Sequence, residues 1–423
     1  MMRKAVIFGA SKLGRKYLPF IEPEYEVVAF SDNNPSLYTP SANADEHLPV
    51  IPPSEIFQLI GAEGLVIVCT GSRYFDEITS QCSSLGLKSA VCVGGTVIDC
   101  TQPNYIVALY KEMAIESRIL QVDLSNKCNL RCRYCPHHSD ESEHSKTWAE
   151  KNEMISWPVV HAIALQAREI KSLTEMQLSG RGEPLFHPNW FEMTSYMLEN
   201  TGIKAVSLNS NGITLTQKNV EKIARLSCQR LEIILSIDGA SPQESEHWRK
   251  GSTYSVIKEN VLNAYKMLNP VNVKFSIHNT CVLPAKYNDS VSHSQVNEYL
   301  RTAGDYLRSD FPFATVWSHE AYYRFEIAGT KKIQVRELEN LRLCTRRFQY
   351  LSILPSGDIN GCGCDPTMWI LGNVLRDNMY DVWLNDPRMT ARRNEFKKGA
   401  PQCRCMMNPQ ISKPYILTVN GEI

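Results

Sequence analysis

Three closely spaced cysteines constrain this chain more than any other feature of its sequence. Cys128, Cys132 and Cys135 have the spacing C-x3-C-x2-C and directly follow an apolar, strand-like run, residues 119–124. Thiolates are soft ligands, and cysteines spaced in this way suit an iron–sulfur cluster or zinc. Three thiolates on a four-iron cluster leave one iron open, whereas a structural zinc would take a fourth ligand from one of the two histidines that follow.

The cysteine stretch resembles the cluster-binding loop of the radical S-adenosylmethionine (radical SAM) superfamily. Tyr134 matches the aromatic residue that precedes the last cysteine in that family and lies near the adenine of SAM. The resemblance implies that the open iron of a [4Fe–4S] cluster binds SAM. It also implies that the reduced cluster cleaves SAM to a 5′-deoxyadenosyl radical, which takes a hydrogen atom from an unreactive C–H bond.

Composition narrows the class of protein. The 423 residues include 45 basic and 45 acidic side chains, so no net field attracts a nucleic-acid backbone and we expect no nucleic-acid partner. The apolar run near the N-terminus is too short for a signal peptide, and no stretch is long enough to span a membrane. We therefore expect a cytoplasmic protein without a membrane partner. In that compartment the 14 cysteines are not expected to form disulfides, and the clustered ones indicate metal ligands.

Residues 1–100 predict a small doubly wound α/β domain. A strand, a glycine-containing turn, a helix and a second strand ending in an acidic residue form a degenerate dinucleotide-binding pattern at Gly9, Ser11, Gly14 and Asp32. This part resembles the Rossmann-like domains of some sugar-modifying and polysaccharide-assembly enzymes. It either binds a nucleotide or sugar nucleotide, or it is a docking scaffold that has lost its ligand. Residues 94–104 are expected to form a connection and residues 105–118 a bridging helix. As a domain division, residues 101–118 are assigned to a linker helix between the first two domains.

Residues 119–330 predict a partial (β/α)6 barrel of the TIM type. Six strands are expected at 119–124, 175–179, 204–209, 231–237, 272–282 and 314–318. In barrels of this kind ligands lie at the carboxyl ends of the strands.

The motifs at those strand ends resemble the SAM-binding positions of the radical SAM family. Gly180-Arg-Gly-Glu183 matches the Gly-Gly-Glu motif, whose carboxylate and carbonyls accept hydrogen bonds from the methionine ammonium. A tight turn with a capping carboxylate, plain Asn-Gly and Asp-Gly turns, and a solvated arginine are the structural alternatives. The residues assigned to SAM by the resemblance are Tyr134, Gly180, Gly182, Glu183, Asn209, Asn211, Ser236, Asp238 and Arg249.

Cys281 lies near the carboxyl end of the fifth expected strand, next to His278 and Asn279. A thiol gives up a hydrogen atom readily, so Cys281 in the radical chamber could quench a carbon radical from the opposite face, which is epimerisation. The alternative is a packed free cysteine. The two neighbours are candidate substrate contacts.

Residues 331–423 predict a small cysteine-rich domain. The spacing C-x12-G-x4-C is followed by a C-x-C pair, and the pattern resembles the SPASM and Twitch extensions, which bind auxiliary iron–sulfur clusters. Five cysteines suffice for one auxiliary [4Fe–4S] cluster and favour the shorter Twitch-like form; a zinc site is the alternative. The expected ligands are Cys344, Cys362, Cys403 and Cys405, and Cys364 can replace one of them.

The sequence therefore predicts a radical SAM enzyme that acts on a carbohydrate, by epimerisation or by alcohol oxidation. Its expected partners are a carbohydrate or other small molecule and a reductant such as flavodoxin or ferredoxin. A peptide-modifying maturase and a non-catalytic assembly protein that keeps the cluster fold are the two alternatives. The carbohydrate assignment rests on the resemblance of residues 1–100 to the Rossmann-like domains of sugar-modifying enzymes, which is an argument by analogy.

Overall fold

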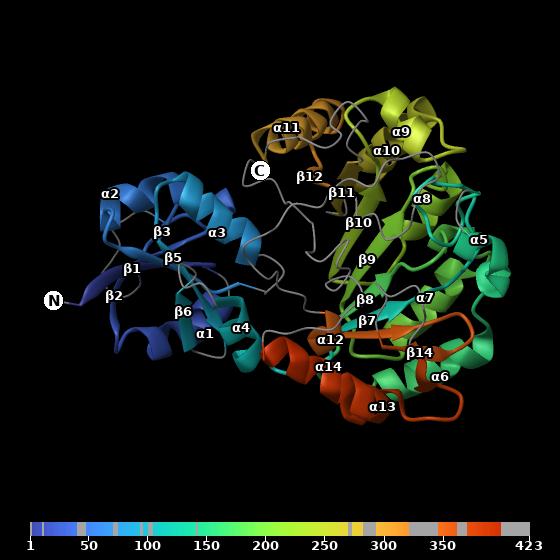
Figure 1. Cartoon of the computed structure of the whole chain (residues 1–423), viewed down its shortest axis with the longest axis horizontal. Coiled ribbons are helices and arrows are strands. Elements are labelled where there is room, and N and C mark those ends of the chain that lie inside the picture. Colours follow the sequence, from blue (N-terminus) through green and yellow to red (C-terminus); the bar gives the residue numbers. More distant parts are fainter. Residues whose placement is uncertain are drawn as a thin grey trace.

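Two mainly parallel sheets organise the chain. The computed structural model describes residues 2–10, 12–39, 48–70, 75–93, 96–99, 105–140, 143–269, 273–281, 293–320, 346–361 and 370–398. Figure 1 shows the smaller sheet, near the N-terminus, beside the larger one, which begins at residue 119.

The smaller sheet is doubly wound, with the strand order β3-β2-β1-β4-β5-β6. Five strands are parallel and β6 is antiparallel to β5. The strands are β1 (Arg3–Phe8), β2 (Tyr25–Ser31), β3 (Val50–Ile51), β4 (Leu65–Val68), β5 (Ser89–Val93) and β6 (Thr96–Asp99). The helices are α1 (Lys12–Ile21), α2 (Ile56–Ile60), α3 (Phe75–Ser84) and α4 (Tyr105–Glu112).

The apolar sequence of β1 explains why helices cover both faces of this sheet. Successive side chains of a strand point to opposite faces. Ala5 and Ile7 belong to one hydrophobic core, and Val6 and Phe8 belong to the other. A strand buried on both faces is a continuous apolar run, which is the pattern that the sequence shows.

Two expectations for the connecting region are wrong. The connection predicted at 94–104 contains β6. This strand pairs with β5, with Val97 opposite Cys92 and Ile98 opposite Val91. The bridging helix predicted at 105–118 ends earlier, since α4 stops at Glu112 and residues 113–118 have no helical structure.

The larger sheet contains the six predicted barrel strands, all parallel, in the order β12-β11-β10-β9-β8-β7. They are β7 (Ile119–Val122), β8 (Glu175–Leu178), β9 (Ala205–Ser210), β10 (Arg230–Ser236), β11 (Lys274–Cys281) and β12 (Thr315–Glu320). The helices between them are α5 (Glu143–Thr147), α6 (Trp157–Ala167), α7 (Trp190–Glu199), α8 (Gln217–Ile223), α9 (Pro242–Trp248), α10 (Tyr254–Leu268) and α11 (His293–Asp310). The described residues include short 3-10 turns at Pro35–Leu37, Pro53–Glu55, Ala149–Asn152 and Pro184–Phe186.

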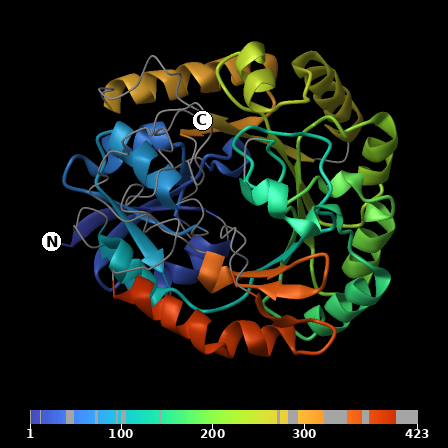
Figure 2. The ribbon, with the colours of Figure 1, turned by 45° about the vertical axis from the view of Figure 1, so that its right-hand side comes forward.

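The outer face of the larger sheet packs against helices, which form an arc around it in Figure 2. Leu120 and Val122 of β7, for example, share a hydrophobic core with Val160 and Ile163 of α6. In the described part of the chain, no helix has the length and hydropathy needed to cross a bilayer.

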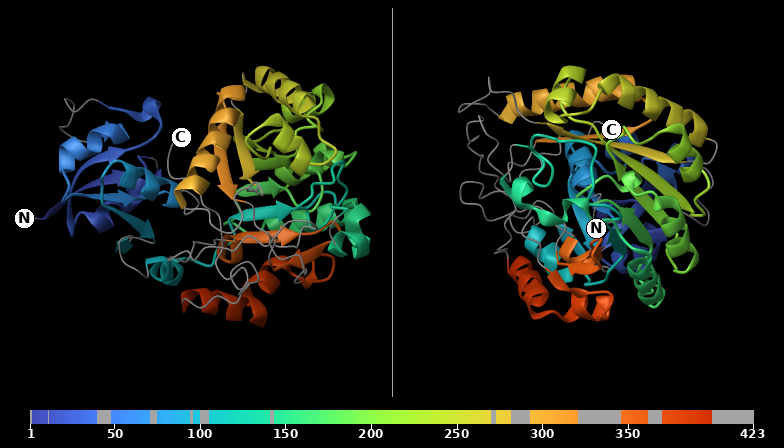
Figure 3. Two further views of the ribbon diagram at one scale, coloured as in Figure 1. Left: turned by 45° about the horizontal axis from the view of Figure 1, so that its top comes forward. Right: turned by 90° about the vertical axis from the view of Figure 1, so that its right-hand side faces the viewer.

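The C-terminal segment extends the barrel sheet. β13 (Tyr350–Ile353) pairs in parallel with β7 and forms the predicted hairpin with β14 (Asp358–Asn360), and β15 (Ile370–Asn373) follows. Figure 3 shows this hairpin continuing the sheet beside β7. Helices α12 (Arg346–Gln349), α13 (Met379–Asn385) and α14 (Pro387–Lys397) complete the described part of this segment.

An aromatic cluster joins the two ends of the chain. Tyr110 of α4 lies 5.5 Å from Phe348 of α12 and 4.9 Å from Phe396 of α14, measured between ring centroids. None of these three side chains is exposed, and they belong to the same core as Val6 and Phe8 of β1. The N-terminal sheet therefore packs onto the C-terminal helices through α4.

We expect Phe396→Ala to lower the free energy of unfolding by about 3–5 kcal/mol, because it leaves a cavity in this cluster. Urea unfolding followed by circular dichroism measures the change. Leu375→Ala is the control, since Leu375 is 53% exposed and its loss should cost less than about 0.5 kcal/mol. Equal effects for the two variants would contradict the assigned role of the cluster.

Candidate active site

The cysteine loop follows β7 and is pinned by backbone hydrogen bonds. The amides of Arg131 and Arg133 donate to the carbonyls of Lys250 and Trp248, each at 2.9 Å. The amide of Cys135 donates to the carbonyl of Cys132, also at 2.9 Å. The loop is therefore held against the segment that follows α9.

The donor set of this loop consists of three thiols, which suit the irons of a cluster. Among the described residues, no three His, Cys, Asp or Glu side chains are arranged to hold one metal ion. A tetrahedral zinc needs its thiolates to converge on one atom about 2.3 Å away. A cubane is different because each of the three thiolates binds its own iron, so the ligands are further apart.

Burial makes these thiols dependent on bound cations. It raises the pKa of Cys128 to about 11 and that of Cys132 to about 12, and it also raises the pKa of Cys135. A buried thiolate is stable only beside positive charge, which iron would supply. The guanidinium of Arg249 contributes in the same direction, since its Nη1 donates to Cys132 Sγ at 3.9 Å and lowers the pKa of Cys132.

The turn after β8 approaches the cysteine loop so closely that its glycines are required. A Cβ on Gly180 would lie 2.0 Å from the Asp123 carboxyl carbon. A Cβ on Gly182 would lie 2.4 Å from the carbonyl oxygens of both Ser125 and Lys127. Both glycines are thus needed to pack this turn against the segment that follows β7.

Gly182→Ala should displace the cysteine loop, because the atoms it meets are backbone atoms and cannot rotate away. Overpacking of this kind costs about 1–3 kcal/mol, and we expect a matching fall in unfolding free energy together with weaker SAM binding. Gly202→Ala is the matched control, since nothing lies within 4 Å of a Cβ there. Equilibrium dialysis of the iron-loaded protein measures SAM affinity. An unchanged affinity in Gly182→Ala would contradict the role of this glycine in positioning the cysteine loop.

Glu183 links the turn after β8 to the end of β9. Its carboxylate accepts from the Asn211 amide at 2.8 Å and from the Thr214 hydroxyl at 2.9 Å. Its own amide donates to the carbonyl of Lys127 at 2.8 Å. Burial raises the pKa of Glu183, and the hydrogen bonds from Asn211 and Thr214 oppose that rise. The predicted contact of Glu183 with the SAM ammonium stays a prediction.

The ends of β9 and β10 carry the other predicted contacts with SAM. Asn209 Oδ1 is buried and has no partner among the described residues, as an unfilled acceptor in a binding site would be. The side chain of Asn211 is instead hydrogen-bonded within the protein. Its Nδ2 donates to Asn129 Oδ1 at 2.8 Å, and its Oδ1 accepts from the Ile213 amide at 3.0 Å. Ser236 is the last residue of β10 and is half-buried.

Asp238, Arg249 and Tyr134 form a buried group beside the cluster loop. Asp238 Oδ2 lies 2.5 Å from Arg249 Nε and accepts a short hydrogen bond from the Tyr134 hydroxyl. Burial alone would lower the pKa of Arg249, but the adjacent Asp238 carboxylate raises it above the ordinary value. Three residues predicted separately for SAM therefore contact one another.

Sequence reasoning missed a second buried ion pair at the same strand ends. Arg181 Nη1 donates to Asp123 Oδ2 at 3.3 Å, and Gln121 Nε2 donates to Asp123 Oδ1 at 3.2 Å. The ring of His138 hydrogen-bonds to the Arg181 carbonyl at 3.0 Å. The only signal in the sequence was the position of Arg181 between two glycines, which does not identify its partner.

The structure describes some of the remaining predicted site residues and not others. Cys281 ends β11, where its backbone lies opposite Glu320, but the structure does not describe its side chain. His278 is exposed on β11, and Asn279 is buried and donates to the Gly239 carbonyl at 3.1 Å. The predicted auxiliary ligands Cys344, Cys362, Cys364, Cys403 and Cys405 are all outside the described residues.

The N-terminal turn packs closely on α1, and its acidic residue is engaged in hydrogen bonds. A Cβ on Gly14 would lie 2.0 Å from the Gly9 carbonyl oxygen, so close packing of α1 requires glycine. Asp32 accepts from the amides of Ala10 at 3.1 Å and Asn34 at 3.0 Å. The carboxylate therefore ties the turn to the end of β2. Ser11 is outside the described residues.

Comparison with known families agrees with this geometry. The family model described as "Radical SAM superfamily" matches residues 122–291, which include the three cysteines and the ends of β8, β9 and β10. The model described as "Iron-sulfur cluster-binding domain" (SPASM) matches residues 344–406. The chain contains a radical SAM domain and a SPASM domain. The radical SAM domain implies a [4Fe–4S] cluster and SAM, and the SPASM domain implies an auxiliary iron–sulfur cluster.

This confirms the predicted partial barrel and the predicted C-terminal cluster domain. The SPASM description matches although the cysteine count favoured the Twitch-like form. The number of auxiliary clusters and their ligands stay predictions. Cys128, Cys132 and Cys135 would hold the SAM-binding cluster.

Curated relatives match part of the chain. A probable GTP 3′,8-cyclase of Methanococcus maripaludis is 30% identical over 159 residues, which is 37% of this chain and 49% of that protein. GTP 3′,8-cyclase 1 of Mycobacterium tuberculosis is 22% identical over 247 residues, 56% of this chain and 61% of that protein. The chain spans about half the length of the first of these relatives.

Solved structures with a similar arrangement include BtrN in complex with AdoMet and 2-DOIA, with a TM-score of 0.42, 13% identity and coverage of 72% of this chain and 100% of BtrN. Streptococcus suis SuiB bound to precursor peptide SuiA has a TM-score of 0.41 and 15% identity, covering 68% of this chain and 69% of SuiB.

Proposed function

We propose that this radical SAM enzyme abstracts a hydrogen atom from an unactivated C–H bond of a carbohydrate, leading to epimerisation or alcohol oxidation. When bound, the cluster and SAM supply the 5′-deoxyadenosyl radical for that step. Acid–base side chains remove only protons that are already acidic, so a sugar C–H bond requires such a cofactor. We place the reaction in the cytoplasm, where an external carrier would provide electrons.

The polar inner face of the barrel is the observation that carries this proposal. TIM-type barrels fill their interior with branched apolar residues. Here one row of neighbouring positions across six strands is polar, and every member is at most 9% exposed. The row, in strand order β14, β13, β7, β8, β9 and β10, consists of Asn360, Ser352, Gln121, Gln177, Ser207 and Glu232.

Alternation along the strands assigns this row to the inner face. Leu120 and Val122 flank Gln121 in β7 and pack with the outer helices, and Met176 and Leu178 do the same around Gln177 in β8. Side chains between them must point the other way. The barrel interior is therefore polar enough to receive a polar molecule.

Buried acceptors in and above the row favour a hydroxyl-rich ligand. Gln177 Oε1, Ser352 Oγ and Asn209 Oδ1 are buried and have no hydrogen-bond partner among the described residues. Each such group costs about 1–3 kcal/mol unless it is satisfied. Sugar hydroxyl groups both donate and accept, so they complement amides and hydroxyls of this kind.

The charged side chains on the inner face are paired, which favours an uncharged group of the substrate inside the barrel. Arg181 pairs with Asp123 at 3.3 Å, Arg230 with Glu175 at 2.7 Å, and Lys274 with Glu232 at 3.3 Å. Each of these cations is matched by a carboxylate, so the described strands provide no surplus positive charge for a triphosphate. Within the barrel, this favours a sugar over the substrate named in the titles of the GTP 3′,8-cyclases. The basic residues Lys127, Arg131 and Lys146 lie outside the barrel strands, on the cysteine loop and on α5.

Turnover with candidate sugars tests the proposal. Anaerobic, reduced protein with SAM should form 5′-deoxyadenosine in proportion to a modified sugar. A loss of about two mass units indicates oxidation, and a gain of about one in heavy water indicates epimerisation. Product from a peptide or from GTP, with none from free, nucleotide-linked or polymer-linked sugars, would contradict the carbohydrate assignment. SAM that stays intact under every condition would instead support a non-catalytic assembly protein.

Cys281→Ala separates the two outcomes. If Cys281 donates the second hydrogen atom, the variant should still form 5′-deoxyadenosine but should lose epimer formation and deuterium uptake. The thiyl radical left on Cys281 would be restored by one electron and one proton from the external reductant. Cys228→Ala, which changes a half-buried lone cysteine of the same domain, is the control. Unchanged turnover and unchanged deuterium uptake in Cys281→Ala would contradict the role proposed for Cys281.

For residues 1–100 we propose a sugar-nucleotide site or a docking scaffold. Isothermal titration of the full chain with nucleotides and sugar nucleotides separates them, with a Gly14→Ala variant as the control. Binding heat that this variant loses supports the nucleotide site, and no heat with any ligand supports the scaffold.

A further inference from the structure

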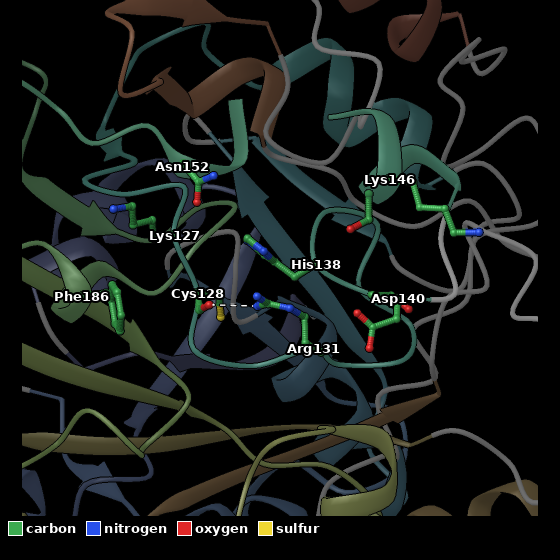
Figure 4. Close-up of a pocket in the computed structure, with 10 residues that line it drawn as sticks. Lys127, Cys128, Arg131, His138, Asp140, Lys146, Asn152 and Phe186 are labelled. Atoms are coloured by element: carbon green, nitrogen blue, oxygen red, sulfur yellow. Dashed lines mark hydrogen bonds between the residues drawn. The ribbon is translucent and has the colours of Figure 1, made fainter. Parts of the chain in front are cut away.

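A cavity of about 480 Å³ opens beside the first cysteine of the cluster loop. Figure 4 shows Cys128, which is part of the cluster loop, among the residues that line this cavity. Cys128 is half-buried, whereas Cys132 is only 9% exposed. Phe186 also lines the cavity and is 43% exposed. The cavity is therefore a short route from solvent to the cluster ligands.

The walls of this cavity are basic, although the chain as a whole is neutral. Lys127, Arg131 and Lys146 line it (Figure 4). Among the described lining residues, Asp140 is the one acidic residue, and Lys250 pairs with that carboxylate at 2.8 Å. The whole chain has 45 basic and 45 acidic residues, so this is a local excess of positive charge.

The basic side chains of this cavity differ in exposure and in their contacts with the loop. Arg131 and Lys146 are exposed, and Lys127 is half-buried. Arg131 Nη1 donates to the carbonyls of Cys128 and Leu130, so its side chain also braces the loop. The contacts of Lys127 with the turn after β8 use its backbone carbonyl, which leaves its ammonium group available for another molecule.

We propose that this basic cavity is where an acidic electron-carrier protein docks to reduce the SAM-binding cluster. A radical SAM enzyme needs one electron from outside for each SAM cleaved, and transfer to a buried cluster requires a close approach. The carrier would lose one electron to the cluster, and cleavage of the sulfonium C–S bond would consume it. Electron-transfer complexes are small and transient, so charge at the rim mainly raises the association rate.

A double variant, Lys127→Glu with Lys146→Glu, tests the proposal in the iron-loaded full chain. Formation of 5′-deoxyadenosine is measured with reduced flavodoxin, an acidic carrier, and separately with dithionite, a small reductant that needs no docking. We expect the flavodoxin-driven rate to fall about 10-fold or more at low salt, since steering of this kind changes rates by 10–10³. The dithionite-driven rate should stay within about twofold.

The salt dependence of the rate and a matched control variant test whether the effect comes from charges at this cavity. Added salt should slow the flavodoxin-driven rate of the unmodified protein and should leave that of the double variant nearly unchanged, because salt screens exposed charges. The control is Lys171→Glu with Lys204→Glu, two exposed lysines that precede β8 and β9 at the opposite ends of the barrel strands. This control should keep both rates.

The possible failures are distinguishable. Equal losses with both reductants, or an unchanged flavodoxin-driven rate, would overturn the docking site. Inorganic phosphate that binds the unmodified protein and not the double variant, with equal flavodoxin-driven rates, would identify an anion subsite and would also overturn it. No 5′-deoxyadenosine from the unmodified protein with dithionite would contradict the enzyme's activity itself.

Discussion

Replacing Cys128, Cys132 and Cys135 together by alanine should give a folded chain that forms no 5′-deoxyadenosine above background. The three thiols are the ligands expected for the SAM-binding cluster, and no other described cysteine lies on this loop. Iron content should fall by about four atoms per chain, from about eight, if the C-terminal domain holds one further four-iron cluster. Iron and sulfide analysis with low-temperature paramagnetic resonance measures the loss.

The control for this experiment is Cys82→Ala, which removes a buried thiol from the N-terminal core. It should keep the iron content and the rate of SAM cleavage. A triple variant that retained about eight irons and cleaved SAM would contradict the assignment of the cluster to this loop.

Asp238→Asn should destabilise the protein by about 3–5 kcal/mol and weaken SAM binding. Asp238 is fully buried and is the carboxylate that balances Arg249, which is only 8% exposed. Removing one partner of a buried pair leaves an uncompensated charge, which costs more than the pair contributed. The asparagine can still accept from the Tyr134 hydroxyl, so the effect isolates the lost charge.

Thermal unfolding and SAM titration of the iron-loaded variant measure these two effects. Asp305→Asn is the control, because Asp305 pairs with Arg301 and Arg308 on the exposed side of α11 and such pairs contribute at most about 1 kcal/mol. Equal stability of the Asp238 and Asp305 variants would show that Arg249 finds another counter-charge.

The strands of the barrel could be predicted because their sequences carry two clear signals. Apolar residues alternate with polar ones at residues 120–124, in and directly after β7, and short polar turns follow β9 and β10. The pairing of β13 with β7 could not be predicted, since strand partners distant in sequence leave no periodic signal. β6 was missed because its four residues stand between two loop-like stretches.

The site was predictable only as far as motif positions allow. Cys128, Cys132 and Cys135 are close in sequence, and the family resemblance supplied the order of the strand-end residues. The contacts of Asp238 with Arg249 and Tyr134 join three segments of the fold, so spacing alone cannot show them. The Asp123–Arg181 pair was missed for the same reason.

The position of β13 constrains how this protein is made. β7 stands inside the sheet, yet one of its neighbours comes from residues 350–353, near the end of the chain. A nascent chain that has emerged only as far as β12 still exposes one edge of β7, and an unpaired edge invites association between chains. The edge of β7 beside the cysteine loop would therefore close only after residues 350–353 have been synthesised.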